Sequence, residues 1–318
     1  SDAVDKGVTP ADVMVFLGLT LDVTDEVIYL TQAKAESYSA LLREVVSGAA
    51  GVVASNSLFA AVDPFNSLVH KLLHACSVIV LGRQHLFHCL RALRTTADLR
   101  AGRMVPVAAA ALKELRWWEA ALASAPSTGV PLATRCRFPD ASAEGVIVPY
   151  SDASRELDSP ESSGFGAWAI VDGVVVYVHG RWLPWELQQL SINVTELAAM
   201  QFGTFTFISF AHSRGLSVSH VLEFTDNTAA EHSAERGRPH SERMHALVSD
   251  RFHRLQSLGV YSAAERVASV DNDVADGLSR GGSMLTDALR IAAGTGMPLI
   301  RLHVHPEIRS LEHLASLR

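Results

Sequence analysis

The order of strand-like and helix-like segments in the second half of the chain constrains the fold most strongly. Three β-rich runs come first, a long helical segment follows, and two further strands then alternate with helices. The predicted strands are residues 146–152, 164–171, 174–182, 221–225 and 260–268, and the long helix is 193–213. Asp172-Gly173 joins the second and third strands as a tight hairpin. This order predicts an α/β (α+β) fold with a mixed five-stranded sheet flanked by helices.

The first part of the chain has helical periodicity and predicts a separate, mostly helical domain. Its strands are expected at 13–22 and 26–30, and its helices at 31–46, 64–80, 83–97 and 105–123. The Ala/Pro/Ser/Thr/Gly-rich stretch 123–134 reads as a linker. We therefore expect domains at 1–135 and 136–282. Residues 283–318 have weaker periodicity and are expected to form a C-terminal tail.

Composition limits the classes of function. The 318 residues are 48% apolar and 19% charged, which suits two folded domains. A net charge of −7 argues against a uniformly basic nucleic-acid binder, although residues 83–116 carry seven Lys/Arg against two acids. Three widely spaced cysteines suit neither a disulfide framework nor a zinc site. They indicate a reducing intracellular compartment, nucleus or cytoplasm. No run approaches the ~18 apolar residues that span a bilayer, and no signal peptide opens the chain. The abrupt start of the sequence suggests part of a longer polypeptide.

Four acidic residues mark the ends of these predicted elements. They are Asp152 in Ser-Asp-Ala-Ser, Glu196 in Val-Thr-Glu-Leu, Asp226 in Phe-Thr-Asp-Asn and Asp276 in Val-Ala-Asp-Gly. Asp152 is expected at the end of the first strand and Asp226 just after the fourth. Glu196 lies on the helix between them and Asp276 on the final helix, so all four can meet at one face of the sheet. Carboxylates are the oxygen ligands that Mg²⁺ prefers. A converging set can hold two Mg²⁺ ions about 4 Å apart for phosphodiester cleavage.

Each acid also has a purely structural interpretation. Asp152 suits a turn, Glu196 the first turn of a helix, Asp226 a helix N-cap and Asp276 an exposed surface. Taken singly, these interpretations are favoured. The ordered set of four, each in a suitable element, favours a metal site.

The motifs around these acids resemble the RNase H domain of retroelement reverse transcriptases, and most closely the DIRS-like, tyrosine-recombinase group. The segments that carry the resemblance are Gly164-Phe-Gly-Ala-Trp-Ala, Ser191-Ile-Asn-Val-Thr-Glu-Leu-Ala-Ala, Phe224-Thr-Asp-Asn-Thr-Ala and Asn272-Asp-Val-Ala-Asp-Gly-Leu-Ser-Arg. The resemblance implies that Asp152, Glu196, Asp226 and Asp276 bind two Mg²⁺ ions, or Mn²⁺. It also implies hydrolysis of the RNA strand of an RNA–DNA hybrid.

The first domain resembles the thumb or connection region of the same enzymes. The matching segments are Phe16-Leu-Gly-Leu-Thr-Leu-Asp, Leu30-Thr-Gln-Ala-Lys, His70-Lys-Leu-Leu-His-Ala-Cys and Leu115-Arg-Trp-Trp. Together the two resemblances cover about residues 12–281. They imply RNA–DNA hybrid or RNA as a partner, together with an upstream polymerase chain or a larger ribonucleoprotein assembly.

Two departures from the family pattern keep alternatives open. The fingers and palm, with their paired polymerase aspartates, are absent from this sequence. Residues 266–272 lack the histidine that precedes the last aspartate in many RNases H. The alternative functions are a domesticated, non-catalytic subunit of a larger assembly, and another nuclease or transposase with an RNase H-like sheet.

Aromatic residues suggest packing rather than binding. Four phenylalanines at helical spacing after Glu196, at positions 202, 205, 207 and 210, are expected in the core. Trp117-Trp118 is expected to be buried between the two domains. His70 and His74 have the spacing of a zinc site, but no nearby ligand set completes one.

Overall fold

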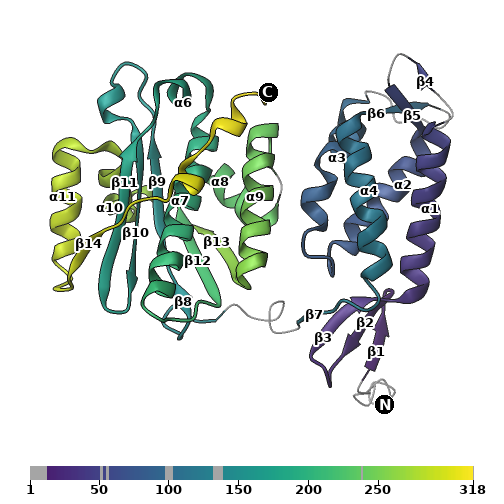
Figure 1. The fold of residues 1–318 in the computed structure, drawn as a ribbon, viewed down its shortest axis with the longest axis horizontal. Coiled ribbons are helices and arrows are strands. Elements are labelled where there is room, and N and C mark those ends of the chain that lie inside the picture. Colours follow the sequence, from purple (N-terminus) through teal and green to yellow (C-terminus); the bar gives the residue numbers. More distant parts are fainter. Residues whose placement is uncertain are drawn as a thin grey trace, which may run out of the picture. The chain divides into compact units, whose positions relative to one another are not determined.

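The structure is a computed structural model that describes residues 13–50, 53–54, 57–96, 103–131, 139–237 and 239–317. The chain divides into two compact units, Ser1–Phe138 and Pro139–Arg318, shown in Figure 1. The boundary expected after residue 135 lies outside the described residues. The predicted mixed α/β fold is confirmed.

The first unit begins with a small antiparallel sheet. Its order is β1 (Val13–Phe16), β2 (Leu19–Asp22), β3 (Val27–Leu30) and β7 (Val130–Pro131). The prediction of one strand over 13–22 was wrong, because this segment folds back on itself as a hairpin. Leu17 and Gly18 turn the chain with φ of 52° and 83°, a left-handed pair that matches the twist of the flanking strands.

Four helices pack into the core of the first unit: α1 (Gln32–Ala50), α2 (Val62–Ala75), α3 (Phe87–Thr95) and α4 (Ala109–Ser124). A 3₁₀ turn at Gly82–Leu86 precedes α3. Three short strands, β4 (Val53–Ala54), β5 (Ser57–Ala61) and β6 (Met104–Val107), were not predicted. The helix expected over 105–123 begins later because Pro106 disfavours helical backbone at Val105, and β6 alternates exposed and buried residues instead.

Trp118 belongs to this core. Its side chain is fully buried in the cluster formed by the first unit, and its indole N–H donates to the carbonyl of His85 at 2.8 Å. A Cβ atom on Gly82 would lie 2.6 Å from the Trp118 ring, so only glycine fits beside it. The expected burial of this residue between the domains was therefore wrong. Trp117 stacks on the His85 ring at 3.9 Å.

The second unit is built on a mixed sheet. Within its described residues the strands are β8 (Val146–Ile147), β9 (Tyr150–Ser154), β10 (Gly164–Val171), β11 (Val174–Arg181), β12 (His220–Thr225), β13 (Tyr261–Arg266) and β14 (Leu299–Arg301). The main order is β13-β12-β9-β10-β11-β14, and β8 pairs with β12. The prediction of five strands was wrong, because the strand expected over 146–152 divides into β8 and β9, and β14 was not predicted. The pairs β9–β10 and β10–β11 are antiparallel, whereas β12 runs parallel to β9 and β13.

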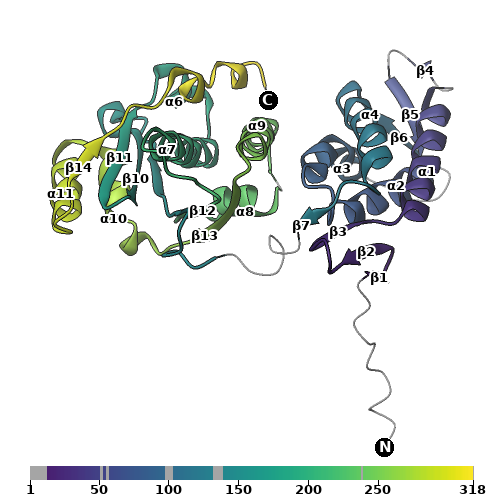
Figure 2. The same ribbon diagram turned by 60° about the horizontal axis from the view of Figure 1, so that its bottom comes forward.

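Helices cover both faces of this sheet (Figure 2). On one face lies α7 (Ile192–Ser213), together with α8 (Thr228–Arg236) and α9 (Glu242–Leu258). The other face is covered by α10 (Asp273–Arg280) and α11 (Gly282–Ala293), which pack on Val175. Phe202, Phe205 and Phe207 of α7 are buried as predicted, whereas Phe210 is only partly buried.

Residues 283–318 were expected as a tail but belong to the second unit. They form α11, then β14, which pairs in parallel with β11, and then α12 (Pro306–Arg309). Arg309 makes an ion pair of 2.6 Å with Glu186, a buried residue of α6 (Pro184–Gln189). Leu311 and Leu314 are buried in the core. The helical turns of this segment are only four and three residues long, too short for a sequence pattern to predict this packing.

Candidate metal centre

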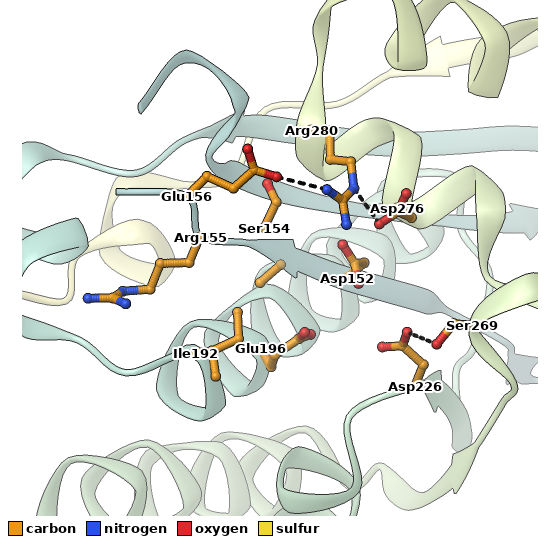
Figure 3. A pocket seen from close by; sticks show the side chains of 11 residues that line it. Asp152, Ser154, Arg155, Glu156, Ile192, Glu196, Asp226, Ser269, Asp276 and Arg280 are labelled. Carbon is orange, nitrogen blue, oxygen red and sulfur yellow. Dashed lines mark hydrogen bonds and ion pairs between the residues drawn. The ribbon is translucent and has the colours of Figure 1, made fainter. Parts of the chain in front are cut away.

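The second unit brings all four predicted acids to one pocket of about 350 Å³. Asp152 lies on β9, Glu196 on α7, Asp226 directly after β12, and Asp276 on α10 (Figure 3). These elements come from both faces of the sheet and from two of its central strands. The pocket therefore exists only when the whole unit is folded.

Three of the four acids lie within reach of a single cation. Each of Asp152, Glu196 and Asp226 offers a carboxylate oxygen that lies within 4.8 Å of the other two. Asp276 also lines the pocket, but its Oδ1 accepts a hydrogen bond of 2.7 Å from Nε of Arg280. The arrangement is thus a compact three-carboxylate group with a fourth carboxylate beside it that is already paired.

The structural interpretations of the single acids do not describe this arrangement. Asp152 is a buried residue inside a strand rather than a turn residue. The N-cap of α8 is Asn227, whose side-chain oxygen accepts from two backbone N–H groups, and Asp226 remains free of that task. Asn227 also donates to the side chain of Asn193 at 3.2 Å, which ties the end of β12 to the start of the helix that carries Glu196.

Two glycines of β10 bring Asp276 to the pocket. A Cβ atom on Gly166 would lie 2.4 Å from the Cβ of Leu278, and one on Gly164 would lie 2.7 Å from the Ser279 carbonyl oxygen. Helix α10 can approach the sheet this closely only because both positions lack side chains. The start of the helix is fixed as well, because the Asn272 amide donates to the Ser151 carbonyl at 3.0 Å.

Burial and mutual repulsion make the site a place where protons or cations are needed. The pKa of Asp152 is raised to about 6, first by burial and then by the charges of Asp276 and Asp226, against the hydrogen bond of 2.5 Å from Ser279. Burial, followed by the charges of Asp152 and Asp226, holds the pKa of Glu196 well above its usual range. Oε2 of Glu196 is buried and has no hydrogen-bond partner.

This donor set fits a divalent cation. Its atoms are carboxylate oxygens, which Mg²⁺ and Mn²⁺ prefer, and they are gathered without a positive side chain inside the three-acid group. An unpartnered oxygen such as Oε2 of Glu196 is costly to bury unless a ligand compensates it. A hard cation would do so.

The polar residues that hydrogen-bond to the acids were not predicted from the sequence. Ser269 donates to Oδ2 of Asp226 at 2.7 Å, Ser279 donates to Asp152, and Arg280 pairs with Asp276. The spacing could have indicated the last two, because residues three and four positions after Asp276 lie on the same side of a helix. Glu156 accepts from Arg280 at 2.9 Å and lines the pocket.

Comparisons with known proteins give only distant likenesses. No protein-family model matches the chain, and no curated protein does. RNase H1 from the halophilic archaeon Halobacterium salinarum is 15% identical with a TM-score of 0.32, over 46% of this chain and 99% of its own. The N-terminal RNase H domain of a Mycobacterium tuberculosis protein is 19% identical with a TM-score of 0.32, over 48% and 99%.

A foamy viral protease–reverse transcriptase in complex with an RNA/DNA hybrid is 11% identical with a TM-score of 0.29. That match covers 80% of this chain but only 29% of the viral protein. Similarity at this level concerns the fold alone. The chemistry of this chain therefore rests on its own residues.

Proposed function

We propose that the second unit is a divalent-metal-dependent ribonuclease that hydrolyses the RNA strand of an RNA–DNA hybrid. The observation that carries the proposal is the group of Asp152, Glu196 and Asp226, whose oxygens converge although Asp152 and Glu196 are buried and Asp226 is half-buried. A structural protein gains nothing from keeping such a group, because buried like charges destabilise the fold.

In this proposal Asp152, Glu196 and Asp226 hold one Mg²⁺ ion, and Asp276 contributes to holding a second; Mn²⁺ is the alternative. When bound, the ions supply Lewis acidity and lower the pKa of a coordinated water. The protein supplies position. Ser279 and Ser269 each fix one carboxylate oxygen by a hydrogen bond, and this leaves the remaining oxygens directed at the pocket.

The wider setting follows the motif resemblance. We infer a retroelement origin in the DIRS-like group, with the first unit as the thumb or connection region and an upstream polymerase chain or ribonucleoprotein as partner. Nucleus or cytoplasm is the proposed location. None of the helices within the described ranges is long and apolar enough to cross a membrane.

The second candidate function is a non-catalytic, nucleic-acid-binding subunit. Residues 266–272 carry no histidine, and the structure instead places Val270 there with 83% of its surface exposed. An exposed apolar side chain directly after Ser269, which lines the pocket, suits contact with a partner better than proton transfer. The uncompensated acids favour the enzymatic proposal over this one.

Cleavage of a labelled RNA–DNA hybrid with Mg²⁺ tests the proposal. We expect the parent protein to cut the RNA strand and leave a 3′-hydroxyl and a 5′-phosphate, and to leave a DNA duplex intact. Asp226→Asn should slow the reaction by at least about a hundredfold, because one metal ligand loses its charge. The matched control is Asp250→Asn, at a half-exposed surface pair with Arg254.

Equal rates for the parent and Asp226→Asn would overturn the proposed chemistry. A parent that binds the hybrid and Mn²⁺ but does not cut would establish the non-catalytic candidate. If Asp250→Asn also lost activity, the loss in Asp226→Asn could not be attributed to a metal ligand. The assignment of the site would then fail.

A further inference from the structure

Arg280 places a positive charge inside the carboxylate pocket. Its guanidinium bridges two acids from different elements: Nε donates to Asp276 at 2.7 Å, and Nη1 donates to Glu156 at 2.9 Å. Figure 3 shows the guanidinium between these two carboxylates and beside Asp152. The second arginine of the pocket, Arg155, points away and donates to the Leu187 carbonyl at 2.7 Å.

The backbone of Arg280 is fixed, whereas its side chain is partly exposed. The Arg280 carbonyl accepts a hydrogen bond of 2.8 Å from Arg181, and Gly281 follows in a left-handed conformation with φ of 72°. The side chains of Arg280 and Glu156 are 39% and 46% exposed. Ion pairs this exposed are weak, so the guanidinium can exchange partners at small cost.

We propose that Arg280 is a positioning residue that occupies Asp276 until a phosphate of the substrate takes its guanidinium and so frees Asp276 for the second metal ion. This inference rests on the proposed function. It assigns to Arg280 a role that follows from the two contacts seen in the pocket. Phosphate is the favoured partner because the planar fork of a guanidinium matches two phosphate oxygens, and such charge-assisted hydrogen bonds are strong.

Two properties follow for the free protein. Its two ion sites should differ in affinity, because Asp152, Glu196 and Asp226 are available at once whereas Asp276 must first give up Arg280. Hybrid and the second ion should also strengthen each other's binding by the same factor, since coupling between two ligands is reciprocal. Glu156 remains hydrogen-bonded to the guanidinium during the exchange and so keeps Arg280 at the pocket.

The first test is a titration of the full chain with Mn²⁺, in which the electron paramagnetic resonance signal reports unbound ion. We expect one strong and one weak class of site in the parent. Arg280→Gln should strengthen the weak class by up to about fivefold, the equivalent of one exposed ion pair. The matched control is Arg290→Gln, at an exposed pair with Asp287 on α11, which should leave both classes unchanged.

The second test measures binding of a short RNA–DNA hybrid by fluorescence anisotropy in EDTA, where no metal supports cleavage. If Arg280 contacts a phosphate, Arg280→Gln should weaken binding and reduce the slope of log affinity against log salt by about one. Arg280→Lys keeps the charge and should retain the slope. Arg290→Gln should behave as the parent does. Melting in EDTA checks that each variant is folded.

The outcomes separate this inference from the proposed function. Absence of Mn²⁺ binding by the parent would overturn both. Two equal sites that Arg280→Gln leaves unchanged would overturn the role of Arg280 and leave the metal centre standing. An unchanged salt slope in Arg280→Gln would overturn the exchange with phosphate.

Discussion

Two carboxylates close together in the sequence have opposite surroundings. Glu223 lies on β12, and Asp226, three residues later, directly follows this strand. The buried Glu223 faces the buried Arg251, whose Nη1 donates at 2.8 Å and whose Nη2 donates to the other oxygen, and Thr204 donates to it as well. Asp226 faces Asp152 and Glu196 across the pocket.

The two sites differ in whether the chain itself supplies the opposite charge. The negative charge of Glu223 is balanced by Arg251 of the same chain, so this ion pair needs no ligand from outside. Asp152 and Glu196 have no cation paired with them among the described residues, and burial together with the neighbouring carboxylates raises the pKa of both. A chain retains an uncompensated buried charge where something from outside completes it. The two clusters should therefore respond in opposite ways to substitution.

The largest effect is expected at the compensated pair. Arg251→Met should destabilise the protein by about 3–5 kcal/mol, because it leaves the Glu223 carboxylate buried without its cation. The change is measured as the free energy of unfolding in urea. Arg254→Met is the control at a half-exposed pair and should cost less than about 1 kcal/mol. Equal losses in the two variants would remove the distinction between the clusters.

The opposite sign is expected at Asp152. Its native pKa of about 6 exceeds the usual value of 3.8, so the native state binds the proton more tightly than the unfolded state does. The free energy of unfolding should therefore fall as pH rises between these two values and remain lower above pH 6. Asp152→Asn removes this loss and should be more stable than the parent by about 2–3 kcal/mol at pH 8 in EDTA.

That gain should shrink as pH falls from about 6 towards 3.8 and vanish below the unfolded-state pKa, where the parent carboxyl is protonated in both states. Urea unfolding at a series of pH values measures it. A constant difference across all pH values would show that charge is not the cause.

Metal should compensate the pocket as Arg251 compensates Glu223. At tenfold excess over its dissociation constant, Mg²⁺ or Mn²⁺ should stabilise the parent by about 1.4 kcal/mol, which appears as a higher melting temperature. Glu196→Gln should lose this increment because one ligand is gone, whereas Asp250→Asn on the surface should retain it. An equal increment in both variants would place the ion elsewhere.

The smallest effect is expected at Ser279. Its hydroxyl donates to Asp152 and favours the carboxylate form. Ser279→Ala should therefore raise the pKa of Asp152 further and change the free energy of unfolding by about 1 kcal/mol. The measurement is the pH midpoint of Mn²⁺ binding, which should move upward. A downward shift would contradict the direction of this contact.

Sequence reasoning predicted the sheet and placed the four acids better than it predicted their neighbours. Asp152 lies in the central strand β9 and Asp226 directly follows the central strand β12, so the topology alone decides where they lie. The contact between Arg280 and Glu156 depends on the path of residues 155–163, a loop without periodicity, and no pattern could indicate it. The prediction of a single strand over residues 13–22 was wrong because Leu17-Gly18 interrupts an apolar run without a polar turn residue.

The C-terminal segment shows a different limit. β14 is three residues long and pairs with β11 at the edge of the sheet, and a strand of this length leaves little periodicity in the sequence. Leu314 is buried by contacts with residues distant along the chain. Tertiary packing alone decides such a segment.

The two glycines of β10 extend the site beyond the residues that line it. Gly164 and Gly166 set how closely α10 approaches the sheet, and so they set the position of Asp276. One added methyl group at Gly166 would lift the last acid away while every carboxylate and every hydrogen-bonding side chain of the pocket stayed in the sequence. A search for inactivating changes that considers only the acids would therefore overlook a strand whose backbone determines whether the fourth acid reaches them.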